Sequence, residues 1–220
     1  MELLSVGTAR FIAGGISTSE LNPRGLLVYP ALIEGMKKKY GFVASPNIQD
    51  TLDESKGIVF QDGAWNNIAI DKVTIFDDGI VVDTRSSTSD SEAIFEEALL
   101  WAAESFGLTY KPEMILHRRY VSELVVRTNV SLNSLNSRLA AFGAKLSKSL
   151  SKFTTLTVEF ELASLAFHYD GSAAKTSVAP FKLEKLDNSA YTENKYYALA
   201  PLPTEEHLKL LEDFEGIFSK

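Results

Sequence analysis

The chain has 220 residues, a net charge of −7 and 45% hydrophobic residues. This composition is enough for a packed core and excludes disorder of the whole chain. Because there is no cysteine, disulfide frameworks, thiolate nucleophiles and cysteine-ligated metals are excluded. No apolar run approaches the roughly 18 to 20 residues that cross a bilayer, and the N-terminus lacks the positive charge of an export signal. We therefore expect a soluble, cytoplasmic protein with no membrane partner.

The first part of the chain predicts a strand and a helix. Segment 3–16 mixes apolar and small residues and ends in paired glycines, which favours a strand followed by a turn. The polar segments 17–24 and 45–56 predict loops. From 29 to 40, apolar residues recur on one face and lysines fill the last turn. We expect a helix over 29–40, ended by Gly41 in the left-handed conformation.

A hairpin that leads into a helix is the clearest folding signal. Segment 58–60 predicts a short strand, closed by a turn at 62–63. Apolar residues then alternate through 68–75 and 80–82, which predicts two paired strands. Asp78-Gly79 between them is typical of a tight turn with positive φ angles.

The helix after the hairpin has marked ends. Ser89 and Glu92 match a capping box, and Gly107 can stop the helix in the left-handed conformation. The hydroxyl-rich run 86–91 could also hold an anion at the helix N-terminus. We favour the capping interpretation, because Asp90 would repel an anion.

The next part of the chain predicts strand, helix and strand. Segment 114–128 is apolar on both faces, which suits a central strand. Ser131 or Asn133 can start a helix. The apolar stripe of this helix is Leu135, Leu139, Phe142 and Leu146. Segment 156–162 alternates apolar with polar residues and is the clearest single strand in the sequence.

The C-terminal part predicts a strand pair and a last helix. The strands begin at 181 and cover 195–200, with a turn at 187–189. Thr204 can cap the last helix, and acidic residues follow in its first turn. Its apolar face is expected to hold Leu208, Leu211, Phe214 and Phe218.

Locally paired strands with helices between them predict a single α+β domain over residues 1–220. We expect a mostly antiparallel sheet with helices packed on one face, and two ferredoxin-like halves are one arrangement of this kind. A subdivision near 107–111 is the alternative. No internal repeat marks a second half.

The three histidines are the side chains whose ordinary pKa suits proton transfer near neutral pH. His117, His168 and His207 belong to no catalytic or zinc-binding motif. We interpret each as a surface or structural residue. The sequence therefore favours a non-enzymatic protein, with no catalytic residue, metal or cofactor.

Positive charge is concentrated in segment 107–152, where eight basic residues stand against two acidic ones. Such a segment in an acidic protein suits a phosphorylated ligand, a nucleic acid or an acidic partner. The candidate ligand-binding residues are Arg118, Arg119, Arg127, Arg138 and Lys145. The alternative interpretation is that this segment faces the protein's own acidic C-terminal part.

These observations lead to three hypotheses for the function. The first is a non-enzymatic interaction or assembly protein that binds a protein partner or associates with itself as a homo-oligomer. The second is an anion-binding module for a nucleotide or nucleic acid, which uses the basic segment 107–152. The third is a hydrolase-like enzyme that uses His117 or His168 with a carboxylate.

Overall fold

The computed structural model describes residues 1–16, 18–46, 57–172 and 177–217. The strands are β1 (Glu2–Gly14), β2 (Ile58–Trp65), β3 (Ile68–Phe76), β4 (Gly79–Thr84), β5 (His117–Arg127), β6 (Ser164–Phe167), β7 (Phe181–Lys185) and β8 (Lys195–Ala200). The α-helices are α1 (Thr18–Leu21), α2 (Tyr29–Tyr40), α3 (Thr88–Phe106), α4 (Ser137–Leu150) and α5 (Thr204–Gly216).

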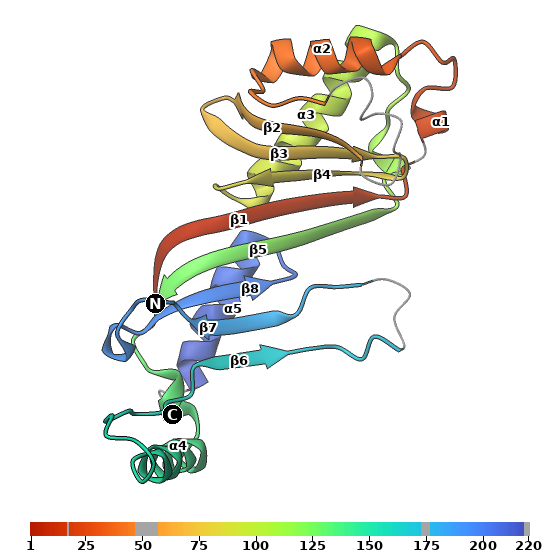
Figure 1. The fold of residues 1–220 in the computed structure, drawn as a ribbon. Helices are drawn as coiled ribbons and strands as arrows, with labels where there is room; N and C mark the ends of the chain where they lie inside the picture. The colour runs from red at the N-terminus through yellow and green to blue at the C-terminus, as the bar shows by residue number, and fades with distance from the viewer. Residues whose placement is uncertain (17, 47–56, 173–176, 218–220) are drawn as a thin grey trace. The chain divides into compact units, whose positions relative to one another are not determined.

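The fold is α+β with an antiparallel sheet, as the sequence predicted. The strands are hydrogen-bonded in the order β2-β3-β4-β1-β5-β8-β7-β6 (Figure 1). Within the described residues, no helix is long and apolar enough to cross a membrane.

The chain packs into two compact units. The N-terminal unit holds Val6–Ser122 and Leu202–Thr204, and the C-terminal unit holds Met1–Ser5, Glu123–Pro201 and the described part of Glu205–Lys220. The boundaries therefore fall inside β1 and β5, and each of these strands contributes to both units. A single domain over 1–220 stays a prediction, because this division describes only the packing within each unit.

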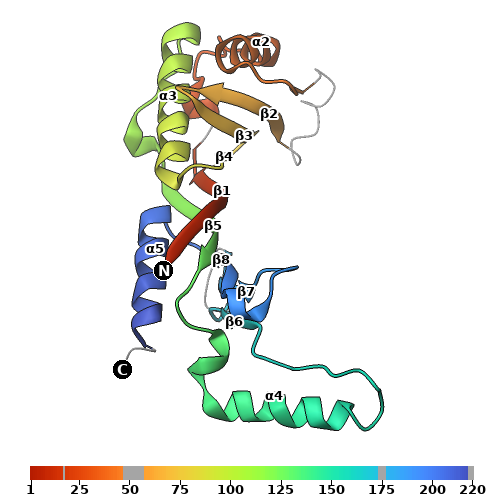
Figure 2. The ribbon, with the colours of Figure 1, turned by 90° about the vertical axis from the view of Figure 1, so that its left-hand side faces the viewer.

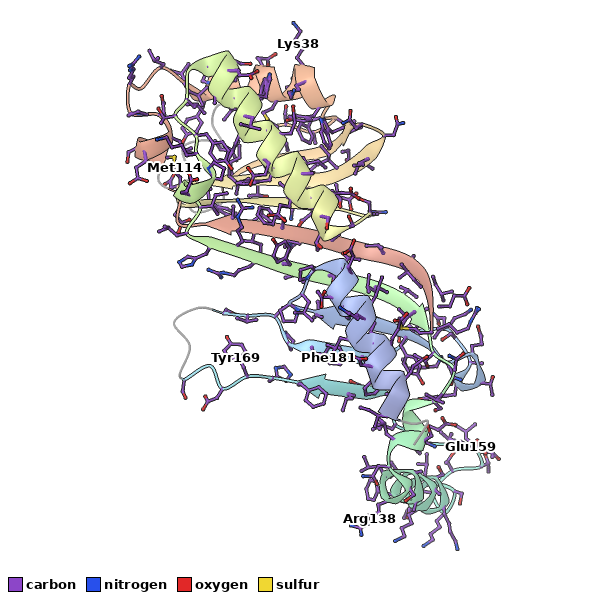
Figure 3. The ribbon with its side chains drawn as sticks, turned by 180° about the vertical axis from the view of Figure 1, so that it is seen from behind. Lys38, Met114, Arg138, Glu159, Tyr169 and Phe181 are labelled. Atoms are coloured by element: carbon purple, nitrogen blue, oxygen red, sulfur yellow. The ribbon has the colours of Figure 1, made fainter. Side chains whose placement is uncertain are left out.

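The N-terminal unit has a core between its strands and two helices. Phe11 on β1 contacts Phe95 on α3, with ring centroids 5.1 Å apart. Ser91 Oγ on the same helix donates to the Ala9 carbonyl at 2.7 Å. Tyr40 at the end of α2 packs edge-on against Trp101 of α3. These contacts hold α3 against β1 and against α2, and Figure 3 shows α3 lying across the strands of this unit.

The helix ends in this unit follow the sequence, with one correction. Gly41 and Gly107 adopt left-handed conformations with φ of 66° and 70°, as predicted. The N-cap of α3 is Ser87, whose side chain accepts from Asp90 N, and the prediction of Ser89 was wrong. Several hydroxyl residues in a row can cap a helix, so the sequence alone did not select one.

The predicted hairpin forms as β3 and β4, but its glycine acts differently from the prediction. Phe76 pairs with Gly79, so Asp77 and Asp78 form the turn. Neither Asp78 nor Gly79 has a positive φ among the described residues. A Cβ at position 79 would lie 2.5 Å from the Ala13 carbonyl oxygen of the neighbouring β1. Glycine is needed here for the close approach of a strand.

Two further predictions in this unit were wrong. β2 continues through the expected turn at 62–63 and ends at Trp65. The turn lies instead at Asn66 and Asn67, which both have positive φ angles of 46° and 65°. The predicted loop 17–24 contains the short helix α1. Most of the predicted loop 45–56 lies outside the described residues.

The C-terminal unit has its own core between strands and α5. β6, β7 and β8 pair in antiparallel fashion, and the predicted strands at 181 and 195–200 are confirmed. Leu183, Ala198 and Leu211 are fully buried, so α5 packs on this part of the sheet through one face (Figure 3). Phe218, predicted for the same face, lies outside the described residues.

Two predictions in this unit were wrong, and they concern one region. Segment 156–162 is not a strand, and the strand of this region is β6 at 164–167. The predicted helix is split into a 3-10 helix at Leu132–Leu135 and α4. Of the predicted apolar stripe, Leu135 is half-buried in the 3-10 helix, whereas Leu139, Phe142 and Leu146 are exposed on α4, which buries no residue.

Candidate interaction surface

α4 and the chain that follows it form a substructure that we call the arm, residues 137–163. Figure 2 shows α4 at one end of the C-terminal unit, with the next segment returning along it. The base of the arm is fixed on both sides. Leu132 N donates to the Tyr196 hydroxyl at 3.0 Å, and Lys185 N donates to the Ala163 carbonyl at 2.7 Å.

The start of α4 is set by its cap. Asn136 Oδ1 accepts from Arg138 N at 2.9 Å and from Leu139 N at 3.4 Å. These bonds satisfy donors that a helix leaves free in its first turn. The helix therefore begins at Ser137, a few residues later than either predicted start.

The returning segment lies against α4 at Gly143 and Ser147. Phe160 N donates to Ser147 Oγ at 3.0 Å. A Cβ at position 143 would lie 2.4 Å from the Phe160 carbonyl oxygen. Glycine inside a helix costs about 1 kcal/mol relative to alanine, and here it allows the two segments to touch. Alternation over 156–162 thus reflects an extended segment on a helix, where no strand ladder forms.

The arm exposes apolar side chains along α4. The apolar row, defined as Leu139, Phe142 and Leu146, recurs at helical spacing on one face. Phe142 is 64% exposed. Phe153 after the helix is 86% exposed. The returning segment adds exposed apolar residues, which are Leu156, Val158 and Phe160. This surface has no cover within the part of the chain that the structure describes.

A second row, on α4 and just past its end, is basic. The basic row is Arg138, Lys145, Lys148 and Lys152, all exposed. Helical spacing places this row beside the apolar row, because three or four residues separate neighbours on one face. Over the described ranges, none of the four makes an ion pair. Their charge is therefore available to a partner.

The exposed side of α5 has the opposite charge. Glu205, Glu206, Glu212 and Asp213 are exposed there, against the single exposed cation Lys209. Leu210 on α5 and Ile217 just past its end are exposed apolar residues. Lys209 lies 3.7 Å from Glu206, which leaves most of this acidity uncompensated within α5.

The structure brings together only part of the predicted ligand-binding set. Arg138 and Lys145 share the basic row on α4. Arg118 Nη2 donates to Glu96 at 2.6 Å, and its other terminal nitrogen donates to Glu92. The bond to Glu96 raises the pKa of Arg118 above its ordinary value.

The other two predicted residues lie elsewhere on β5. Arg127 pairs with Glu2 at 2.6 Å, and Arg119 is half-buried. Both Arg118 and Arg127 therefore already have carboxylate partners within their own units. Anion binding by the five residues stays a prediction, and the geometry concentrates it on α4.

The histidines differ in their surroundings. His117 and His168 are exposed. His207 on α5 is fully buried and meets the Phe181 ring edge-on, with centroids 6.1 Å apart. Burial lowers the pKa of His207 from 6.5 to about 4, so it is neutral at neutral pH. Among the described residues, no three His, Cys, Asp or Glu side chains are grouped to hold a metal ion.

Comparison with known proteins adds no assignment: the chain matches no protein-family profile, and no curated protein matches it in sequence. A functional assignment therefore has to come from the arm and its chemistry. The sequence pointed to the basic segment, but it gave no signal that the apolar row would remain exposed. Alternation and amphipathicity indicate an apolar face without showing what covers it.

Proposed function

We propose that this protein is a non-enzymatic assembly protein whose copies associate through the arm. The observation that carries the proposal is the exposed apolar row of α4 beside a basic row that has no internal ion pairs within the described chain. Contiguous exposed apolar side chains rimmed by charge mark interaction sites. Burial of a Leu or Phe side chain is worth about 1.5–3 kcal/mol, so the row supplies a driving force for association. The cytoplasmic location expected from the sequence is part of this proposal.

The partner surface that fits the arm is α5 of a second copy. On α5, Glu206 and Asp213 are seven residues apart, and the apolar Leu210 is seven residues before Ile217, which directly follows the helix. The basic row repeats the same spacing, because Arg138 precedes Lys145 by seven residues, and Lys152 follows seven later. Seven residues of helix rise about 10 Å. Charged and apolar groups therefore recur at matching intervals on both helices.

The order of the rows also fixes the direction of the contact. Viewed from the N-terminus, the apolar row of α4 follows the basic row in one rotational sense. On α5, Leu210 and Ile217 follow Glu206 and Asp213 in the same rotational sense. Two such helices that meet through their apolar rows place opposite charges on the same side only when they run antiparallel. The proposed contact is therefore α4 of one copy antiparallel to α5 of another, with basic residues opposite acidic ones.

Removal of the apolar row tests the proposal. We expect the wild-type protein to be oligomeric in light-scattering chromatography, with a mass that increases with concentration. Phe142→Ser with Leu146→Ser should shift it to the monomer, because these side chains lose the apolar contact. The matched control is Leu100→Ser on α3, which removes a side chain of similar exposure, 55% against 64% for Phe142.

The control decides between a specific surface and general stickiness. Leu100→Ser should leave the oligomer intact. A monomeric wild-type protein at high concentration contradicts self-association, and an equal loss of oligomer in both variants contradicts the role of the arm.

The second candidate is anion binding, which the unpaired basic row favours. An oligonucleotide would bind mainly through its phosphates, so affinity should fall steeply with salt. Charge reversal at Lys145 and Lys148 should abolish such binding in the Phe142→Ser, Leu146→Ser variant. If this monomeric variant binds no oligonucleotide at low salt, this candidate is excluded.

A further inference from the structure

The N-terminal unit contains a large apolar cavity, partly open to solvent, between its helices and strands. Its volume is about 630 Å³. The side chains along its walls include Leu32 and Met36 of α2, Val73 of β3, Val82 of β4, and Phe95 and Leu99 of α3. All lining residues belong to this unit, so the cavity shares no residue with the arm and goes beyond the proposed function.

The size of the cavity marks it as a binding site. Protein interiors are packed about as densely as organic crystals, and few of their voids exceed one water molecule. Ligand pockets occupy about 300–1,000 Å³. A far smaller apolar cavity, of about 150 Å³, stays dry and takes up small hydrocarbons. A cavity of 630 Å³ walled by apolar side chains is therefore suited to an apolar occupant.

The polar side chains of Asn22 and Tyr40 at the wall form hydrogen bonds within the protein. Asn22 Nδ2 donates to the Leu27 carbonyl at 2.9 Å, and Leu27 N donates back to Asn22 Oδ1 at 3.2 Å. The Tyr40 hydroxyl donates to the Glu97 carboxylate. Burial and this carboxylate raise the pKa of Tyr40, so its phenol stays neutral. The described lining contains no charged side chain. The enclosed part of a ligand must then be uncharged.

The rim of the cavity lies where the chain enters α2. Val28 and Tyr29 line the cavity and are exposed. A polar end group placed there reaches water, whereas other lining residues, such as Phe95 and Val82, are fully buried. The cavity therefore reaches solvent at Val28 and Tyr29 and is lined by buried residues elsewhere.

We propose that this cavity binds a long-chain aliphatic compound, with its hydrocarbon chain among the helices and strands and its polar end at Val28 and Tyr29. The lining is mainly Leu, Ile, Val, Met and Ala, which accommodates a flexible alkyl chain. Since no cation belongs to the described lining, recognition comes from the chain and not from the charge of the end group. A neutral alcohol and a carboxylate of equal length are therefore both ligands, and the alcohol binds at least as tightly.

Methyl NMR tests this on the wild-type protein. The chain has three methionines, Met1, Met36 and Met114, and only Met36 lines the described cavity. With methyl-labelled methionine, dodecanol should shift the Met36 signal until it saturates at one equivalent and leave Met1 unchanged. Met36→Leu assigns the signal. An unmoved Met36, or equal shifts of Met1 and Met36, overturns the proposal.

Two further experiments test the class of ligand and the position of its binding site. Dodecanoate should also move Met36, and binding of dodecanoate without binding of dodecanol contradicts recognition through the chain. Ala98→Phe on the cavity wall should weaken binding at least tenfold, whereas Ala103→Phe, on the same helix but away from the wall, should not. Equal affinity of Ala98→Phe and the wild type contradicts this cavity as the site. Thermal unfolding of both variants checks that they fold.

Discussion

The fold changes the chemistry of His207. It is fully buried on α5, and burial lowers its pKa from 6.5 to about 4. Above pH 6.5 the histidine is neutral in both folded and unfolded states and adds no pH dependence. Between pH 6.5 and 4 the unfolded state binds a proton that the folded state does not. The free energy of unfolding should therefore fall by about 3 kcal/mol over this range because of His207.

Denaturant unfolding at several pH values measures this effect. Carboxylates titrate in the same range, so the comparison is between the wild type and His207→Leu. The variant should lack the part of the decrease that belongs to His207, and the difference between the two proteins should level off below pH 4. Parallel curves for both proteins would show that His207 gains its proton equally in both states.

The sequence predicts the role of a residue well when that role depends only on its neighbours along the chain. Gly41 and Gly107 end helices as expected, because the left-handed conformation is a property of a few residues in a row. Turn geometry was the explanation for Gly79, and Gly143 had no explanation from the sequence. Each is in fact required by a segment distant in sequence, β1 and the returning segment respectively. A single sequence does not show such neighbours.

At the scale of the element, the arm depends on the contact between α4 and its returning segment. Gly143→Ala places a Cβ 2.4 Å from the Phe160 carbonyl oxygen, so the segment must move away and Phe160 N loses its bond to Ser147 Oγ. Hydrogen exchange at the Phe160 amide should speed up by more than tenfold. α4 itself should persist, because alanine is favoured over glycine within a helix.

Gly216→Ala on α5 is the matched control. Nothing lies within 4 Å of a Cβ at that position. The control should leave exchange at Phe160 unchanged, and unchanged exchange in Gly143→Ala as well would mean that the segment is not held at this glycine.

The elements also show why patterns succeed or fail. The strands that begin at 181 and cover 195–200 form as predicted, because they pair with each other and bury alternate residues beneath α5. Segment 156–162 alternates equally well, but its neighbour is a helix, so no ladder forms. The sequence predicted the apolar stripe of α4, and amphipathic helices usually bury such a stripe against a core. Within the described chain it faces none, and this mismatch identified the candidate site.

At the scale of the whole molecule, charge is distributed unevenly along the chain. The protein carries −7 overall, yet α4 and the turn after it have four cations with no acidic residue. The sequence revealed this excess, but it did not separate cations that are satisfied internally from those that are free. Arg118 and Arg127 bind carboxylates far away in sequence, Glu96 and Glu2. Arg127 meets Glu2 because β5 lies beside β1, and Arg118 meets Glu96 because α3 packs on the sheet.

The most direct test of assembly through α4 and α5 is a charge exchange followed by sedimentation velocity. Lys145→Glu with Lys152→Glu should give monomers, because each acid then opposes an acid of the partner's α5. Glu206→Lys with Asp213→Lys should do the same for the converse reason. All four changes in one chain restore opposite charges across the contact, and the oligomer should return. If the fourfold variant stays monomeric while the wild type is oligomeric, the proposed α4–α5 contact is wrong.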